Sequence, residues 1–96
     1  MRRLRMSVVA LILLATGCLT EAQLLALRTC ESKGDYSAVS GSGTYRGAYQ
    51  FSHKTWRTVG GSGDPAQAPP EEQDMRARLL HLRDGSGQWP VCGKRI

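Results

Sequence analysis

Apolar residues recur at helical spacing just after position 22. Leu24, Leu27 and Glu31 stand at i, i+3 and i+7, on one face of a helix predicted over residues 23–32. A lysine and a glycine follow and are expected to end the helix. A carboxyl group at the end of an apolar stripe loses part of its hydration, which raises its pKa. Glu31 is therefore the first candidate for acid–base chemistry.

The middle of the chain changes from an irregular segment to a short helix. Residues 37–49 mix glycines and short polar residues with tyrosines and show no helical period, which predicts a turn or a small hairpin. Ser52 can then cap a helix over residues 53–59. Phe51 and Trp56 occupy the two positions of a hydrophobic staple, so Trp56 is expected in the core rather than on a sugar-stacking surface.

A third helix is predicted from Pro70, because proline is tolerated at a first helical position. Met75, Leu79 and Leu82 repeat at helical spacing and are expected to face inward. Gly85 is the predicted end. We interpret this helix as structural.

The first residues have the pattern of an export signal. Three arginines within the first five residues precede an apolar run over residues 8–15, which is too short to span a membrane comfortably. We therefore predict a signal peptide over residues 1–22 and one domain over residues 23–96. The exported protein is expected to be secreted or associated with the bacterial cell surface or wall.

Two processing sites are compatible with this signal. The sequence "LLATGC" resembles a bacterial lipobox, in which Cys18 would become the lipidated first residue and a possible membrane anchor. "TEA", at residues 20–22, offers an ordinary small-residue cleavage site and free secretion. Both alternatives stay open from the sequence.

The chain has three cysteines. Removal or lipidation of Cys18 leaves Cys30 and Cys92, a pair in an oxidising setting, so we predict one disulfide. The bridge would supplement the small core that a domain of this length can form.

Charge and motif patterns exclude several classes of function. After residue 22 there are ten Lys or Arg and seven Asp or Glu, so the net charge is 10 − 7 = +3. This mild excess suits an anionic polymer such as a bacterial wall, but no basic run or basic helix face indicates nucleic acid. His53 and His81 lie on separate elements and no CxxC or GxSxG motif occurs, so neither a metal, another cofactor nor a serine nucleophile is expected.

An ordered set of motifs carries a specific resemblance. "CESKGDYSAV", "YRGAYQFSHKTWRTVGGSGDPAQA" and "WPVC" resemble the catalytic domain of actinobacterial resuscitation-promoting factors, the transglycosylase-like branch of the lysozyme superfamily. The resemblance implies a mainly α, lysozyme-like fold (α+β at most) with three or four short helices, an irregular hairpin-like cleft segment and one disulfide. It also implies action on peptidoglycan glycan strands by a protein we expect to be a monomer.

The resemblance assigns roles to individual residues. Glu31 matches the family's catalytic acid, and Tyr45 and Gln50 fall in the segment that lines its cleft. Asp35, four residues after Glu31, and Tyr49 complete the candidate substrate contacts. Cys30 and Cys92 match the disulfide that ties the catalytic helix to the C-terminal segment.

Residues 33–36 depart from the family pattern. The family more often has Gly-Gly-Asn-Trp where this chain has Lys-Gly-Asp-Tyr, and leucine replaces an aromatic residue early in the first helix. The alternative to an enzyme is therefore a non-catalytic wall-binding or signalling module on the same scaffold. A phage- or plasmid-borne wall-remodelling factor would have the same chemistry in another biological role.

The expected mechanism uses a single carboxyl group. Conventional glycosidases use two, but Gly34 separates Asp35 from the helix of Glu31, and Asp64 precedes a proline in a turn. Glu31 is thus predicted to protonate the bond between N-acetylmuramic acid and N-acetylglucosamine. It would then act as a base toward the sugar's own 6-hydroxyl, as in lytic transglycosylases, or toward water, as in lysozymes.

Overall fold

The first helix of the domain begins before the predicted boundary. The computed structural model describes residues 17–96, so residues 1–16 of the predicted signal over residues 1–22 lie outside the described residues. Helix α2 spans Glu21–Ser32, two residues longer at its start than predicted. Thr20 and Gln23 form a capping box, in which each side chain accepts a hydrogen bond from the other residue's backbone N–H. The predicted boundary at residue 22 therefore falls inside a capped helix.

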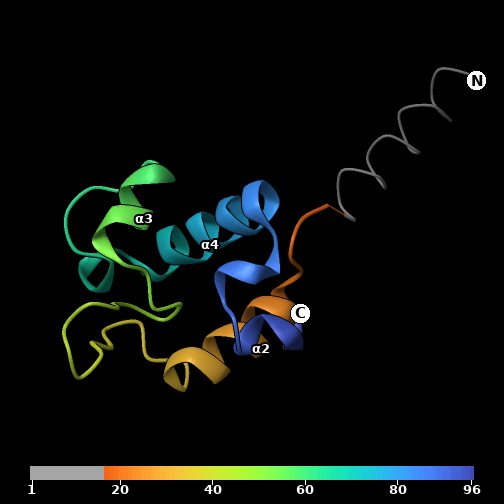
Figure 1. Ribbon diagram of the computed structural model, residues 1–96, viewed down its shortest axis with the longest axis horizontal. Helices are drawn as coiled ribbons and strands as arrows, with labels where there is room; N and C mark the ends of the chain where they lie inside the picture. The colour runs from red at the N-terminus through yellow and green to blue at the C-terminus, as the bar shows by residue number, and fades with distance from the viewer. Residues whose placement is uncertain (1–16) are drawn as a thin grey trace, which may run out of the picture.

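The described chain is mainly helical (Figure 1). Helix α2 is followed by two further α-helices and three short 3₁₀-helices: α3 (His53–Thr58), η1 (Pro65–Gln67), α4 (Pro70–Asp84), η2 (Ser86–Gln88) and η3 (Cys92–Arg95). No strand occurs between residues 17 and 96. This arrangement confirms the mainly α fold class and is consistent with the lysozyme-like domain that the resemblance implies.

The irregular segment between α2 and α3 folds back on itself without forming strands. Arg46 makes isolated antiparallel bridges to both Val39 and Phe51. Its guanidinium group also donates two hydrogen bonds of 2.7 Å to the Asp64 carboxylate. The predicted hairpin-like segment is confirmed, and the ion pair ties it to the loop before η1.

Helix α3 forms as predicted but ends one residue earlier, at Thr58. The Ser52 hydroxyl caps it by accepting a hydrogen bond from the Thr55 N–H. The rings of Phe51 and Trp56 meet edge to face with their centroids 5.0 Å apart. Trp56 is fully buried, so the prediction that it belongs to the core is confirmed.

The predicted inward face of α4 is wrong. Met75, Leu79 and Leu82 are exposed. The buried positions of this helix are Gln73, Ala77 and Leu80. Gln73 can be buried because its amide is fully engaged: it accepts from Ala48 N–H and donates to the carbonyls of Tyr36 and Ala68. A prediction from hydrophobicity alone assigns such a glutamine to the exposed face. The predicted buried face was therefore rotated about the helix axis relative to the observed one.

A disulfide joins the two ends of the domain. Cys30 on α2 and Cys92 at the start of η3 are bonded, with Cα atoms 5.7 Å apart and 62 positions apart in sequence, as predicted. Cys18 has an exposed free thiol. The C-terminal segment is thereby held against α2 (Figure 1).

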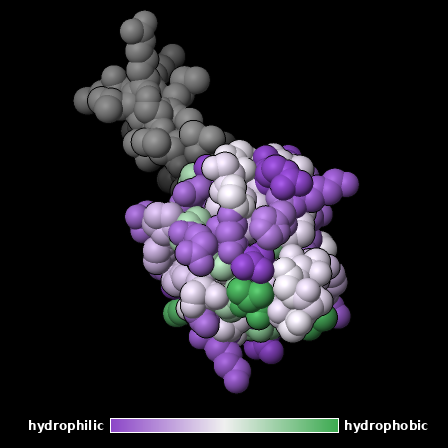
Figure 2. All heavy atoms as spheres, turned by 90° about the vertical axis from the view of Figure 1, so that its left-hand side faces the viewer, coloured by the Kyte–Doolittle hydropathy of each residue, from purple (hydrophilic) through white to green (hydrophobic). Residues whose placement is uncertain are grey.

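The core collects apolar side chains from every part of the described chain. Its fully buried members include Leu24, Leu27, Ala48, Tyr49, Trp56 and Ala77. The face turned toward the viewer in Figure 2 is mostly hydrophilic or intermediate, with isolated hydrophobic residues. No helix of the described residues is long and apolar enough to cross a membrane.

Candidate active site

Glu31 lies in the last turn of α2, where the apolar stripe ends. Lys33, in a left-handed conformation with φ of 58°, ends the helix two residues later, as predicted. The Glu31 side chain is half-buried, and this burial raises the pKa of its carboxyl group. Within residues 17–96 the carboxyl group has no ion pair that would offset the effect. A proton is therefore held more tightly here than on an exposed glutamate.

A groove of about 480 Å³ opens beside this carboxyl group. Three of the predicted site residues, Glu31, Tyr45 and Gln50, line it together. Tyr45 is 51% exposed, so its ring is free to contact a ligand. Tyrosine rings suit the apolar faces of sugars, and the Gln50 amide offers both a donor and acceptor.

A second part of the groove lining was not predicted from the sequence. It consists of residues 88–91, from the end of η2 to the residue before Cys92. Trp89 is nearly buried and its indole N–H donates a 3.0 Å hydrogen bond to the Tyr49 carbonyl, whereas Val91 is 74% exposed. The signal was present in "WPVC", because the disulfide brings the residues before Cys92 next to the residue after Cys30.

Asp35 does not line the groove. Its carboxylate accepts hydrogen bonds from the Ser37 hydroxyl at 2.7 Å and the Ser37 N–H at 2.9 Å, and these bonds lower the pKa of Asp35. Asp64 is paired with Arg46, whose hydrogen bonds lower the pKa of Asp64. It also caps η1, as expected for a turn residue. Glu31 is the one carboxyl among the described residues that line the groove.

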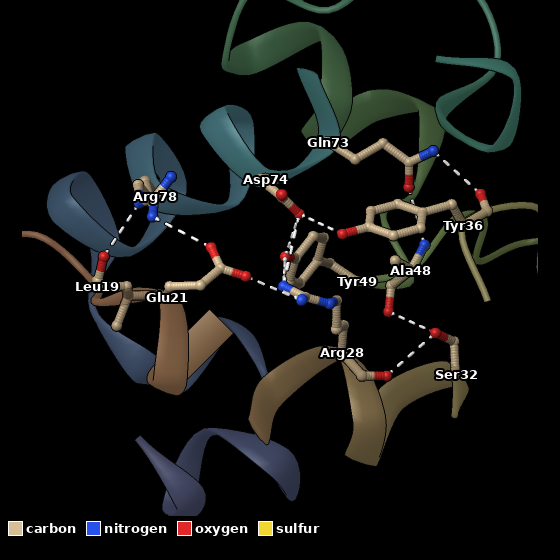
Figure 3. A network of polar contacts seen from close by, with 10 residues as sticks. All are labelled: Leu19, Glu21, Arg28, Ser32, Tyr36, Ala48, Tyr49, Gln73, Asp74 and Arg78. Atoms are coloured by element: carbon tan, nitrogen blue, oxygen red, sulfur yellow. Dashed lines mark hydrogen bonds and ion pairs between the residues drawn. The ribbon is translucent and has the colours of Figure 1, made fainter. Parts of the chain in front are cut away.

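Tyr49 is buried, and its hydroxyl is part of an internal polar network (Figure 3). It donates a 2.5 Å hydrogen bond to Asp74 of α4 and accepts a 3.2 Å bond from Arg28 of α2. Burial and the bond to Asp74 raise the pKa of Tyr49. Because its ring has no exposed surface, the structure does not support the predicted contact between Tyr49 and substrate.

Two further hydrogen bonds hold the segment between α2 and α3 against the helices. The Ser32 hydroxyl, one residue after Glu31, donates to the Ala48 carbonyl at 2.8 Å. The Tyr36 hydroxyl donates to Asp74 at 2.8 Å, so the aromatic residue of the divergent 33–36 segment is used inside the domain. Figure 3 shows Arg28, Tyr49 and Tyr36 converging on Asp74. This network fixes the segment that carries Tyr45 and Gln50 relative to α2.

Gln50 has an unusual backbone conformation. Its φ of 55° is in the left-handed region, which is uncommon for a residue with a Cβ atom. Its side-chain amide donates a 2.9 Å hydrogen bond to the Gly47 carbonyl, which closes the turn. The bond leaves its amide oxygen available at the groove.

Gly47→Ala is expected to lower the free energy of unfolding by at least about 2 kcal/mol. Gly47 has φ of +85°, and an added Cβ would lie 2.6 Å from the Gln73 amide oxygen. Gly43→Ala is the matched control, because Gly43 has φ of +76° but open space around it. We expect it to cost about 1 kcal/mol in urea unfolding, and equal losses in the two variants would contradict the packing argument.

No group of three or more His, Cys, Asp or Glu side chains that could hold a metal ion occurs in the part of the chain that the structure describes. The groove lining supplies one protonatable carboxyl group, a tyrosine, the side-chain amides of Gln50 and Gln88, and apolar surface from Trp89, Pro90 and Val91. Such a set suits proton donation to a bound ligand.

Comparison with known families matches residues 19–92 to the transglycosylase-like domain. The chain belongs to this family. Among curated relatives, it is 41% identical to the resuscitation-promoting factor Rpf of Micrococcus luteus over 70 residues, covering 73% of this chain and 31% of Rpf. It is 44% identical to RpfE of Mycobacterium tuberculosis over 70 residues (73% of this chain, 40% of RpfE), and 41% identical to RpfC of the same species over 68 residues (71% and 48%).

The transglycosylase-like domain accounts for nearly all described residues of this chain, but the chain spans less than half the length of these relatives. Its family membership confirms the resemblance drawn from the motifs. Glu31 and all the groove residues identified above lie within the matched range.

Proposed function

We propose that this protein is an exported enzyme that cleaves the β-1,4 bond between N-acetylmuramic acid and N-acetylglucosamine in peptidoglycan. The observation that carries the proposal is the half-buried Glu31 carboxyl, without an ion pair, in the groove of a transglycosylase-like domain. We further propose a role in cell-wall remodelling, as the name of the resuscitation-promoting relatives suggests.

The reaction begins with a proton transfer. Protonated Glu31 donates its proton to the glycosidic oxygen, the bond from that oxygen to the muramoyl C1 breaks, and positive charge develops on the sugar ring. The resulting Glu31 carboxylate then removes a proton from the attacking group. Attack by the muramoyl 6-hydroxyl gives a 1,6-anhydro end, and attack by water gives a reducing end.

The absence of a second carboxyl among the described lining residues favours this single-acid mechanism. A retaining glycosidase needs a carboxylate about 5 Å from its acid, and an inverting enzyme needs one farther away to activate water. Asp35 is engaged by Ser37 and Asp64 by Arg46. Neither carboxylate is available in the groove as nucleophile or base.

Tyr45 and Gln50 are proposed to position the glycan strand. The exposed Tyr45 ring can pack on a sugar face, while the Gln50 amide oxygen can accept a hydrogen bond from a hydroxyl or N-acetyl N–H group. Pro90 and Val91 add apolar surface to the lining of the same groove. A ligand bound in this groove would expel water from Glu31 and keep its proton in place.

The second candidate is a non-catalytic wall-binding or signalling module. The divergent segment over residues 33–36 favours it. However, the Tyr36 hydroxyl of that segment donates a hydrogen bond to Asp74 inside the domain, and Tyr36 does not line the groove. The difference from the family at this position therefore affects internal packing rather than the groove. The geometry therefore supports the enzyme better than the module.

Digestion of purified peptidoglycan tests the proposal. Released fragments would be separated and weighed by mass spectrometry. Anhydro-muramoyl ends would identify a lytic transglycosylase, and reducing ends a muramidase. Sedimentation of the protein with the wall, without any released fragment, would contradict the enzyme and support the binding module.

The initial rate of fragment release is expected to fall as pH rises through the pKa of Glu31. Burial raises this pKa, so the catalytic proton persists to higher pH than it would on an exposed glutamate. The falling limb should thus lie above the ordinary glutamate pKa of about 4.3. Rates measured from about pH 4 to about pH 8 at constant ionic strength provide the check. A falling limb at the ordinary value would contradict the role of burial.

A further inference from the structure

The residues just before α2 are integral to the folded domain. Leu19 is only 3% exposed and belongs to the core cluster. Its carbonyl accepts a 3.0 Å hydrogen bond from Arg78 of α4, which lies 59 positions away in sequence. Figure 3 shows Arg78 reaching both Leu19 and Glu21. Leu19 thus connects the start of α2 to α4.

The next two residues also have structural partners. Thr20 forms the capping box with Gln23. Glu21 makes an ion pair of 2.9 Å with Arg28 and a second of 3.7 Å with Arg78. Arg28 is the same side chain that donates a hydrogen bond to the hydroxyl of Tyr49, the residue before Gln50 of the groove lining. The first turn of α2 therefore belongs to the network that supports the candidate site.

Processing after Ala22 would remove all of these contacts. The mature chain would begin at Gln23 without Leu19, without its helix cap and without the carboxylate that pairs with Arg28. The family match independently begins at residue 19. A cut on the N-terminal side of Leu19 would keep all of these contacts in the mature domain.

The residues immediately before Leu19 have the opposite character. Gly17 and Cys18 are exposed. Ala15 and Gly17 are small residues at the third and first positions before the 17–18 bond, the spacing that export peptidases accept. We propose that maturation hydrolyses the Gly17–Cys18 peptide bond. Water adds across this bond, leaving a carboxylate on Gly17 of the leader and an amino group on Cys18 of the mature chain.

The position of the N-terminus in the exported protein tests this inference. The full chain would be produced in an exporting bacterial host, and both membrane and medium fractions would be analysed by intact mass and N-terminal peptide mapping. We expect the mature chain to start at Cys18, with or without a lipid adduct on its thiol. A mature chain starting at Gln23, at any other residue, or remaining uncut would overturn the proposal.

Two substitutions to the same bulky residue sharpen the test, since Gly17 and Ala22 are both exposed and each precedes one candidate cut. Gly17→Phe is expected to abolish the Cys18 terminus and accumulate precursor, whereas Ala22→Phe should leave that terminus unchanged. The reverse pattern would overturn the inference. The measured quantity is a terminus rather than an activity, so it is independent of whether the proposed cleavage of peptidoglycan is correct.

Discussion

Glu31→Gln is expected to reduce the release of wall fragments by at least about 100-fold, the lower end of what a general acid contributes. The amide has nearly the size and shape of the carboxyl group but cannot supply its proton to a glycosidic oxygen. Because burial disfavours the charged form of Glu31, removing the charge should leave the melting temperature at neutral pH unchanged or raise it. The variant should therefore be folded and inactive.

Glu71→Gln is the matched control for this experiment. Glu71 is exposed in the first turn of α4 and does not line the groove. Fragment release by this variant should equal that of the unmodified protein, measured by mass spectrometry on the same wall preparation. Equal release by the Glu31→Gln variant would remove Glu31 from the mechanism.

Cys92→Ser is expected to lower the free energy of unfolding by about 4 kcal/mol, because the bridge to Cys30 closes a loop of 62 positions. For a domain of this size the melting temperature should fall by roughly 15 °C or more. The effect should extend to activity, since residues 88–91 of the groove wall directly precede Cys92. Thermal unfolding followed by circular dichroism measures the first effect, and fragment release measures the second.

Cys18→Ser controls for the loss of a thiol as such. The Cys18 thiol is exposed and free, so its substitution should leave the melting temperature within about 2 °C of the original. Addition of a reductant should lower the melting temperature of this control but not that of the Cys92→Ser variant. A Cys92→Ser variant as stable as the control would contradict a stabilising bridge.

The features predicted correctly from the sequence depend on local patterns or on a small number of cysteines. The left-handed end of α2 at Lys33 and the Ser52 cap of α3 each involve residues within one turn of the chain. The Cys30–Cys92 pair was accessible because only one pairing remains once Cys18 is set aside. Burial of Trp56 followed from its staple partner, Phe51.

The features that were missed depend on partners far away in sequence. Gln73 is buried because it bonds to Ala48, 25 positions earlier, and nothing in its neighbourhood along α4 indicates this. Tyr49 is drawn inward by Asp74 and Arg28 for the same reason. The groove wall over residues 88–91 becomes visible only when the disulfide is placed in three dimensions. The start of α2 at Glu21 was also missed, because the Thr20–Gln23 pair was not recognised as a capping box.

The disulfide between Cys30 and Cys92 makes the assembly of the groove depend on the redox state of the compartment. Bacterial cytoplasm keeps thiols reduced, and disulfides form after export. If the protein is exported as proposed, a chain still inside the cell would lack the covalent tie between the helix bearing Glu31 and residues 88–91 of the groove lining. We expect chains without the bridge to release fewer wall fragments. Fragment release assayed in reducing and oxidising buffers would measure the difference. Under the proposed function, the oxidising compartment that contains the peptidoglycan would also be the one in which the Cys30–Cys92 bridge forms.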